Sequence, residues 1–369
     1  MPGAVFSPVA HRMREVPGGV CPLHVGDTWM PPFLGGRMES LSEAAHPGMH
    51  RYCDTQGLLP LREALAAKLR ARNALDVDPD AVLVTAGATG ALSAALGAIL
   101  APGDEVLVLA PFWPLSRGII EAYRGVPVEV PFYDRVDSAA AAVAALDAHS
   151  TSRTVAAYVS TPSNPTGRVL PGDWLEAIAA WARRRDLWLL SDEVYEDYVY
   201  RGEHVSLGRF APERTLSAFS FSKAYGMAGN RVGYLAAPVA AVVEALKIAT
   251  HTFYAAPTAS QLAAQEALEA GADWVTRARE LYRAAGDASA RALALPPVEG
   301  STFHFFDVAN KLDERGLWGF LEDCVQDGFA LAPGPSCGRD YDTWVRLCYT
   351  AAPPDDVAAA VAKLAARTR

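Results

Sequence analysis

The segment Ser220-Phe-Ser-Lys-Ala-Tyr-Gly-Met-Ala-Gly-Asn-Arg231 decides the fold assignment. It follows a predicted strand, so Lys223 lies in a small, hydroxyl-rich loop at the end of that strand. Ser220, Ser222 and Arg231 supply donors suited to a phosphate. Lys223 can form an imine once its amine is deprotonated. A lone lysine is usually a solvated surface charge, but these neighbours favour a chemical role.

On both sides of this segment, short apolar runs alternate with Ala- and Leu-rich helical stretches. We expect strands at 82–85, 105–109, 126–130, 154–160, 187–191, 216–221 and 232–236. We expect helices at 88–100, 114–123, 139–148 and 173–184. This order predicts an α/β fold with a mostly parallel central sheet flanked by helices.

The chain is long enough for two domains, with 369 residues of which 51% are hydrophobic. A long predicted helix at 272–293 is followed by a break at Pro296-Pro297, and the remaining strands and helices resemble a separate lobe. We therefore predict a large domain at 41–285 and a smaller α+β domain formed by 1–40 and 286–369.

Composition excludes several classes of function. The net charge of −9, without a clustered basic surface, disfavours a nucleic-acid partner. No apolar run is long enough to span a membrane and the N-terminus lacks a signal-peptide core, so we expect a cytoplasmic protein. The five cysteines are scattered without a C-x-x-C spacing, so we expect reduced thiols and no metal site.

Two motifs follow neighbouring predicted strands. Ser191-Asp192-Glu193-Val194-Tyr195 places Asp192 at the carboxyl end of a strand, where open α/β sheets bind ligands. Taken alone, the motif could be a helix N-cap aspartate beside a packed tyrosine. Ser163-Asn164-Pro165-Thr166-Gly167 could equally be a simple strand-to-helix turn.

Three further segments have both a functional and a structural interpretation. Ala88 and Thr89 begin a predicted helix, whose free N–H groups favour a phosphate, although a plain capping loop has the same sequence pattern. Trp113 follows another strand and can stack on a ring or pack in the core. Arg346 lies in an apolar strand and needs an anionic partner there.

Together these segments resemble the class I/II aminotransferases of fold type I, which depend on pyridoxal 5′-phosphate (PLP). The Lys223 segment is similar to the family pattern Ser-x-Ser-Lys-x(7)-Arg, and Tyr52 to Gly57 is similar to its Tyr-x(4)-Gly segment. His24-Val-Gly26-Asp27 resembles the N-terminal substrate loop. The matches run in family order to Arg346, and the resemblance implies the fold of a PLP-transferase, a large sheet domain with a smaller α+β domain.

The resemblance also implies a role for each matched residue. Lys223 would carry PLP as a Schiff base and act as general base, Asp192 would bind the pyridine nitrogen, and Tyr195 would bind the phenolic oxygen. The phosphate would be bound by Ala88, Thr89, Ser220, Ser222 and Arg231, and Trp113 would stack on the ring. Asn164 would contact the phenolic oxygen and the substrate, and Arg346 would bind the substrate carboxylate. Gly26 and Trp29 would contact the substrate, and Tyr52 would contact the phosphate of the partner subunit.

The implied reaction moves an amino group between an L-amino acid and a 2-oxo acid, in a homodimer with composite active sites. A cyclase, lyase or racemase on the same scaffold is the nearest alternative. A non-catalytic PLP-binding regulator is more remote, because no N-terminal helix-turn-helix is visible. The amino donor stays open, because no arginine is clearly placed to read a second carboxylate. Pocket candidates that could also be packing residues are Trp29, Phe33, Tyr254 and His304.

Overall fold

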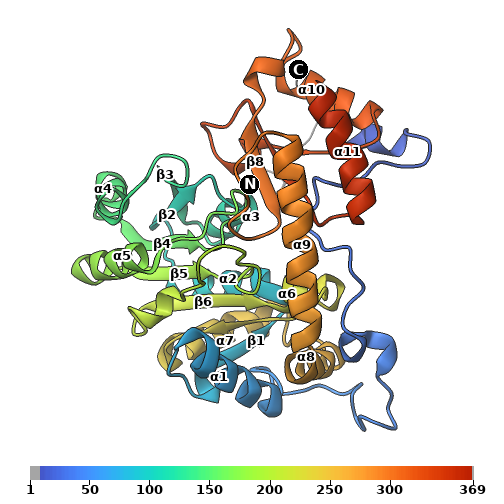
Figure 1. Ribbon diagram of the computed structural model, residues 1–369. Helices are drawn as coiled ribbons and strands as arrows, with labels where there is room; N and C mark the ends of the chain where they lie inside the picture. The colour runs from blue at the N-terminus through green and yellow to red at the C-terminus, as the bar shows by residue number, and fades with distance from the viewer. Residues whose placement is uncertain (1–8, 368–369) are drawn as a thin grey trace.

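In the computed structural model, which describes residues 9–367, seven strands form a central sheet in the order β1-β7-β6-β5-β4-β2-β3 (Figure 1). The strands are β1 (Val82–Thr85), β2 (Glu105–Ala110), β3 (Val126–Pro131), β4 (Thr154–Ser160), β5 (Trp188–Asp192), β6 (Thr215–Ser220) and β7 (Gly233–Ala236). Strands β2 to β6 pair in parallel, whereas β7 is antiparallel to β1 and β6. The expected mostly parallel sheet is confirmed.

Helices cover both faces of this sheet. Strand β2 is buried along its whole length, as expected of a parallel strand that is covered on both faces. One face packs against α2 (Gly87–Ile99), α3 (Leu115–Ala122) and α7 (Val239–Thr252), and the other against α4 (Ala139–His149) and α5 (Gly172–Arg185). Helices α1 (Leu59–Asn73) and α8 (Thr258–Ala270) pack together beyond the β1 end.

The topology gathers five strand ends at one edge of the sheet. Because β1 is antiparallel to β7 and β7 is antiparallel to β6, β1 points in the same direction as β2, β4, β5 and β6. The motifs that follow these five strands therefore meet at the carboxyl edge, which is where open α/β sheets bind their ligands.

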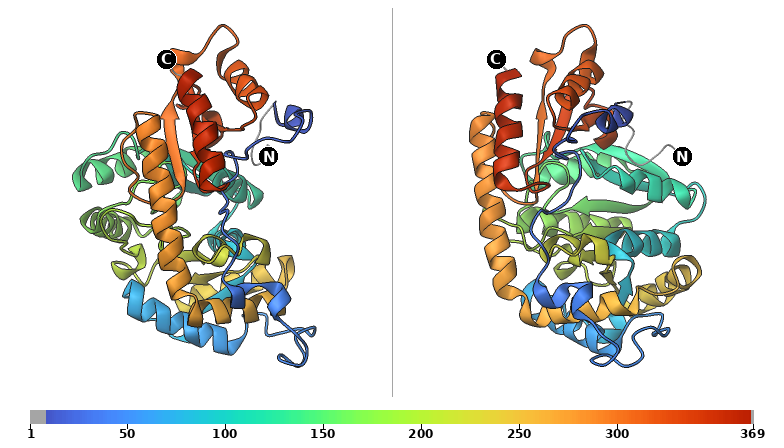
Figure 2. Two further views of the ribbon diagram at one scale, coloured as in Figure 1. Left: turned by 45° about the vertical axis from the view of Figure 1, so that its right-hand side comes forward. Right: turned by 90° about the vertical axis from the view of Figure 1, so that its right-hand side faces the viewer.

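A smaller lobe lies above this edge and carries an antiparallel sheet in the order β8-β10-β9 (Figure 2). Its elements are β8 (Phe303–Asp307), α10 (Gly316–Gln326), β9 (Ala332–Pro333), β10 (Trp344–Cys348) and α11 (Pro354–Arg367). The N-terminal segment joins this lobe, since Cys348 N–H donates to Leu23 O.

Helix α9 (Ala272–Ala292) runs without a break along both lobes. The predicted domain boundary at 285 falls inside this helix and stays a prediction, and residues 1–8 of the predicted small domain lie outside the described residues.

A single turn of helix, α6 (Phe221–Ala224), follows β6. The short 3-10 helices are η1 (Ala10–Arg14), η2 (Leu34–Gly36), η3 (Met38–Ser40), η4 (Pro79–Ala81), η5 (Leu207–Arg209), η6 (Ala228–Asn230), η7 (Ala309–Lys311) and η8 (Gly334–Cys337). None of the helices within residues 9–367 has an apolar stretch long enough to cross a bilayer.

Candidate active site

A cavity of about 370 Å³ opens where the carboxyl edge of the large sheet faces the smaller lobe. Most of the site residues predicted from the sequence line this one cavity. They are Gly26, Ala88, Thr89, Trp113, Asn164, Asp192, Tyr195, Ser220, Ser222, Lys223, Arg231 and Arg346. Segments more than 300 residues apart in the chain, at Gly26 and Arg346, therefore contribute to the same site.

Lys223 lies in α6, and its amine donates a hydrogen bond to the carbonyl oxygen of Gly26. Burial lowers the pKa of Lys223, and the positive charges of Arg231 and Arg346 lower it further, against the opposing charge of Asp27. A larger fraction of this amine is therefore neutral near pH 7 than for a solvated lysine. A neutral amine is the form that attacks a carbonyl and accepts a proton.

Asp192 is the last residue of β5 and is buried. Its Oδ2 accepts a hydrogen bond from the hydroxyl of Tyr158 at 2.5 Å, and its Oδ1 accepts a longer one from Val194 N–H at 3.4 Å. Burial raises the pKa of Asp192 to about 6, with the charge of Glu193 adding to the rise and the two hydrogen bonds opposing it. This carboxylate is well placed to hold a cationic group in the cavity.

The cavity also contains a cradle of donors that suits a phosphate. Ala88 and Thr89 are in the first turn of α2, where backbone N–H groups and the helix dipole favour an anion. Gly87, with φ +71°, lets the guanidinium of Arg231 come close, because a Cβ at this position would lie 2.6 Å from Arg231 Nη2. At the end of β6, Ser220 Oγ accepts from Ser222 N–H and caps α6.

Arg346 comes from the middle of β10 and is almost fully buried. Its Nη1 donates to Asn164 Oδ1 and its Nη2 to His24 O, both at 2.9 Å. The guanidinium also stacks over the ring of Phe303, 4.5 Å from the centroid. Its Nε is buried without a hydrogen-bond partner. The residue lines the cavity, where its positive charge is available to an anionic ligand.

The profile of the aminotransferase class I and II family matches residues 34–364, which is most of the chain. The chain belongs to this family. It is 40% identical over 257 residues to the aspartate/prephenate aminotransferase of Thermus thermophilus, a match that covers 66% of this chain and 64% of that protein. The chain thus matches slightly less than two thirds of that relative's length.

Longer matches within the family have lower sequence identity. The aromatic-amino-acid aminotransferase 2 of Thermococcus litoralis is 32% identical over 329 residues, which is 85% of this chain and 83% of that protein. A solved structure of a single mutant of Thermus thermophilus aspartate aminotransferase superposes with a TM-score of 0.90 at 33% identity, over 100% of this chain and 97% of that chain. The expected fold type I architecture is confirmed by this similarity.

Two predicted site residues of this family member lie away from the cavity. Tyr52 is 89% exposed, and its ring contacts Tyr254 at a centroid distance of 5.1 Å. Both line a separate surface hollow formed by residues 50–53 and 253–258. The side chain of Trp29 packs against the cluster that contains Met30 and Tyr195, and the backbone N–H of Trp29 donates to Thr350 O. Within one chain, neither side chain reaches the cavity.

The other pocket candidates are packing residues. Phe33 packs against the cluster around α1 and α8. His304 is buried away from the cavity, where its Nε2 lies 3.0 Å from Ser289 Oγ and 3.1 Å from Gly286 O. Burial lowers the pKa of His304 to about 4, which is consistent with a neutral core histidine.

Several cavity residues were not assigned a site role from the sequence. The additional lining residues are His24, Val25, Leu92, Pro114, Leu115, Val194 and Ala228. All seven lie within three residues of a predicted site residue, and this proximity is the signal that could have identified them. Tyr158 contacts Asp192 from the adjacent strand, and only the pairing of β4 with β5 brings the two together.

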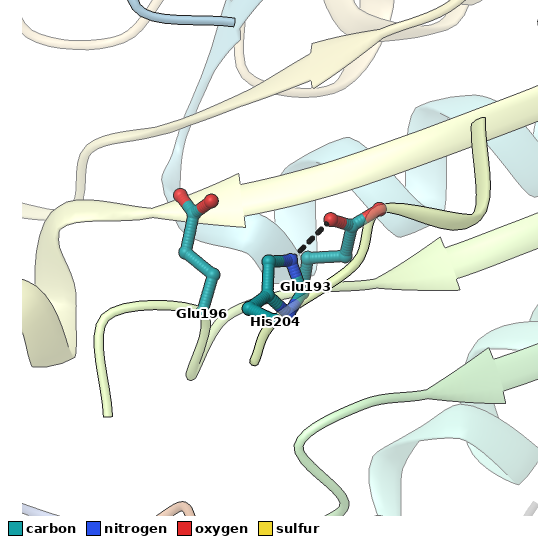
Figure 3. Close-up of side chains that lie close together, drawn as sticks. All are labelled: Glu193, Glu196 and His204. Atoms are coloured by element: carbon teal, nitrogen blue, oxygen red, sulfur yellow. Dashed lines mark hydrogen bonds and ion pairs between the residues drawn. The ribbon is translucent and has the colours of Figure 1, made fainter. Parts of the chain in front are cut away.

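Glu193, Glu196 and His204 lie close together, with one polar atom of each within 4.8 Å of the others (Figure 3). Glu193 is fully buried and accepts hydrogen bonds from Ser191 Oγ and Ser206 Oγ, with His204 Nε2 at 2.8 Å. Burial would lower the pKa of His204, but the bond to Glu193 and the charge of this residue raise it overall.

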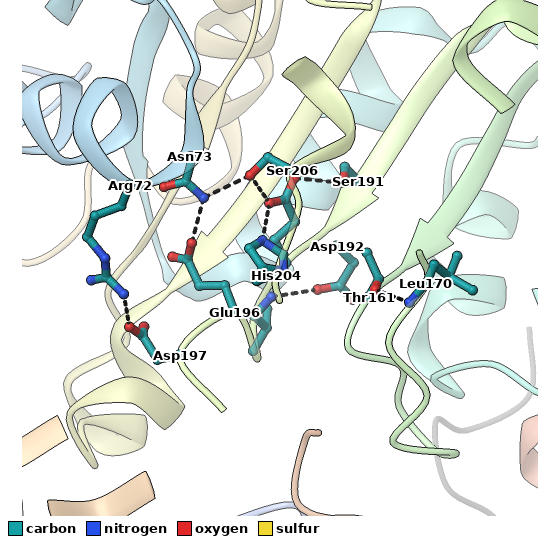
Figure 4. Close-up of polar contacts among 12 residues, drawn as sticks. Arg72, Asn73, Thr161, Leu170, Ser191, Asp192, Glu196, Asp197, His204 and Ser206 are labelled. Carbon is teal, nitrogen blue, oxygen red and sulfur yellow. Dashed lines mark hydrogen bonds and ion pairs between the residues drawn. The ribbon is translucent and has the colours of Figure 1, made fainter. Parts of the chain in front are cut away.

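Hydrogen bonds and balancing charges account for this cluster without a metal ion. Glu196 forms an ion pair with Lys68. Glu196 also accepts from Asn73 Nδ2 at 2.7 Å, and Asn73 donates to Ser206 (Figure 4). The network holds Glu193 and Glu196, the immediate sequence neighbours of Asp192 and Tyr195. We therefore interpret it as structural support for the two cavity residues.

Proposed function

We propose that this protein is a PLP-dependent aminotransferase that transfers an amino group between an L-amino acid and a 2-oxo acid. The observation that carries the proposal is that Lys223, Asp192 and Arg346 line one cavity together with the anion cradle. The amine of Lys223 can attach the cofactor, and the carboxylate of Asp192 can pair with a protonated ring nitrogen. The guanidinium of Arg346 can bind the carboxylate of the substrate.

The donor set of the cavity fits PLP. The first turn of α2, with Ser220, Ser222 and Arg231, offers several donors to a phosphate, and Asp192 offers a carboxylate to a protonated ring nitrogen. Trp113 supplies an aromatic face for the ring. Asn164 and Tyr195 supply polar groups for the phenolic oxygen.

When bound, PLP supplies a ring that accepts the electrons left when a bond to the substrate α-carbon breaks. The residues of the chain bind the substrate and move its proton. Arg346 would hold the substrate carboxylate with the help of Asn164, and the buried amine of Lys223 would take a proton from the α-carbon and deliver it to the carbonyl carbon of the cofactor. Asp192, as a carboxylate, keeps its cationic partner protonated.

A cyclase, lyase or racemase would use the same three residues for its first proton transfer. The family and its named relatives favour transamination over these alternatives. The named relatives, which are aminotransferases, also disfavour a non-catalytic regulator.

We also propose a homodimer with composite active sites. Its support is the exposure of Tyr52 beside Tyr254, since such an aromatic pair on the surface of one chain suits an interface with a second copy. In the dimer, Tyr52 would reach the phosphate of the partner subunit. The cytoplasmic location stays a prediction.

A screen of amino acids tests the proposed function. Protein loaded with PLP is mixed with one amino acid at a time, and absorbance follows conversion of the aldehyde form of the cofactor to its amine form. Mass spectrometry then identifies the product, and a 2-oxo acid is expected. A racemised, cyclised or eliminated product would assign the protein to one of the alternative reactions.

A further inference from the structure

Tyr198 bonds to the backbone of the turn that carries Lys223. The residue is fully buried, and its hydroxyl donates to the carbonyl oxygens of Lys223 at 2.7 Å and Ala224 at 3.2 Å. Burial raises the pKa of this hydroxyl well above its ordinary value, so the group stays protonated and remains a donor. Tyr198 therefore holds the main chain of the residue whose amine would attach the cofactor.

The helix that presents Lys223 has little support of its own. Helix α6 contains four residues, and the last carbonyl groups of a helix have no partner within it. Lys223 O also accepts from Gly226 N–H, at a longer 3.3 Å. The bond from Tyr198 comes from outside the helix and is shorter, so it contributes directly to keeping this turn in place.

Three other segments hold Tyr198 itself. Its backbone N–H donates to Tyr195 O at 2.9 Å, and its carbonyl oxygen accepts from Ser301 N–H at 2.8 Å, just before β8. Its ring packs edge-on against Tyr282 of α9, at a centroid distance of 5.3 Å and an interplanar angle of 77°. The hydroxyl that bonds to Lys223 thus belongs to a side chain with a fixed position.

The aromatic cluster that contains Tyr198 also supports other residues of the cavity. Phe303 belongs to this cluster, and its ring packs edge-on against Tyr195 at 5.7 Å between centroids. The guanidinium of Arg346 lies over the same ring of Phe303. Tyr198 therefore ties the Lys223 turn to the structure that holds Tyr195 and Arg346.

We propose, on the basis of the proposed aminotransferase function, that Tyr198 is a positioning residue for proton transfer by Lys223. Its hydroxyl would keep the main chain of Lys223 fixed while the side chain moves between its attachment to the cofactor and the α-carbon of the substrate. Tyr198 lies outside the lining of the cavity. It should therefore affect the transfer of the α-proton and leave the binding of the amino acid unchanged.

The first test examines the amine of Lys223 without the cofactor. Cofactor-free protein is labelled with a trace of acetic anhydride over a range of pH, and mass spectrometry gives the midpoint of the Lys223 titration. Tyr198→Phe keeps the ring and loses the hydroxyl, so the loosened turn should let water reach the amine. Because burial is what lowers the pKa of Lys223, the midpoint should shift to higher pH.

Tyr349→Phe is the matched control. It removes another fully buried hydroxyl that donates to a backbone carbonyl, that of Ser301 at 2.9 Å. Urea unfolding should show similar losses of stability in the two variants, since each loses one buried hydrogen bond. Only Tyr198→Phe should shift the midpoint of Lys223.

The second test separates proton transfer from binding in the PLP-loaded protein. The substrate is whichever of L-aspartate and L-phenylalanine converts the cofactor faster, and its α-methyl analogue serves as a ligand without an α-proton. In Tyr198→Phe, the maximal rate of the amine-forming half-reaction should fall by roughly three- to tenfold, the effect of one lost hydrogen bond. The dissociation constant of the analogue should not change, and Tyr349→Phe should alter neither quantity.

The outcomes separate this inference from the proposed function. An unchanged midpoint in Tyr198→Phe, or an equal shift in Tyr349→Phe, would overturn the inference even if the protein is an active aminotransferase. A maximal rate that does not fall, or a dissociation constant that rises as much as the rate falls, would also overturn it. Failure of the unmodified protein to convert any amino acid would overturn the proposed function, and the labelling would still decide whether Tyr198 holds Lys223.

Discussion

The hydroxyl of Tyr158 donates a hydrogen bond to Oδ2 of Asp192 at 2.5 Å, across the pair of strands β4 and β5. Both residues are buried, and this bond favours the charged form of the carboxylate. Burial acts in the opposite direction and raises the pKa of Asp192 to about 6. Tyr158 is therefore a positioning residue that keeps a carboxylate available in an apolar setting.

Tyr158→Phe should reduce turnover, because Asp192 loses its short hydrogen bond and holds its own proton more tightly. A hydrogen bond to a charged group contributes about 1.5–3 kcal/mol, so kcat should fall by roughly tenfold or more with little change in the KM for the amino acid. Steady-state kinetics measure both. Tyr200→Phe is the matched control, since its buried hydroxyl donates to Ser301 O instead. Equal losses in the two variants would contradict the role of Tyr158.

Asp192→Asn should stabilise the cofactor-free protein above pH 6. The folded state binds the proton of Asp192 more tightly than the unfolded chain does, because its pKa rises from 3.8 to about 6. Stability therefore falls as the pH rises through this window. The variant avoids that loss, so its advantage should reach up to about 3 kcal/mol at pH 7.5 and disappear near pH 4.

Urea unfolding of both cofactor-free proteins at the two pH values measures this difference. A gain of the same size at pH 4 and pH 7.5 would show that the effect is not the titration of Asp192. Turnover by the loaded variant should be severely reduced, because an amide cannot balance a cationic ring nitrogen.

Borohydride treatment of the PLP-loaded protein should fix the cofactor covalently on Lys223, because this amine is buried and its pKa is lowered. Peptide mapping by mass spectrometry locates the adduct. Lys223→Ala should give no adduct, whereas Lys247→Ala, which removes a surface lysine paired with Glu244, should give the normal one. An adduct on another lysine would refute the assignment.

Arg346→Ala should weaken capture of the amino acid by roughly 2–5 kcal/mol, the range for truncating one partner of a buried charge pair. Arg346→Lys should restore only part of the loss, since lysine keeps the charge but lacks the planar fork that binds Asn164 and His24 O together. The KM of the half-reaction measures both effects. Arg183→Ala removes an exposed pair with Glu213 and should have no effect. A normal KM in Arg346→Ala would place the carboxylate site elsewhere.

Most of the predicted site residues line one cavity because their motifs lie at or directly after the ends of strands. Asp192 ends β5, and Trp113, Asn164 and Lys223 follow the parallel strands β2, β4 and β6 of the same sheet, so their convergence depends only on the fold class. The local pattern does not give the strand order. The pairing of Ser160 with Asp192 places Tyr158 within reach of that carboxylate, and this register cannot be read along the chain.

Trp29 is a residue whose position relative to the cavity the sequence did not predict. It lies three residues from the cavity residue Gly26, yet its ring packs against the cluster of Met30 and Tyr195. The loop is held in this path by hydrogen bonds to β10 and Thr350, which are more than 300 residues away in the chain. Side-chain direction in such a loop is set by tertiary contacts, so proximity in the sequence is a poor guide.

The composite dimer gives the last prediction, a complementation experiment. Tyr52 is exposed and lies outside the cavity of its own chain, whereas Lys223 lines that cavity, so the two residues should serve different subunits' sites in the dimer. A hybrid of one Lys223→Ala chain and one Tyr52→Ala chain would then contain one doubly damaged site and one intact site. Once Tyr52→Ala alone is shown to impair turnover, mixing the two variants under conditions of subunit exchange should restore activity above either parent. Activity that stays at the parental level, with hybrid formation proven by native mass spectrometry, would mean that Tyr52 does not complete the partner's site.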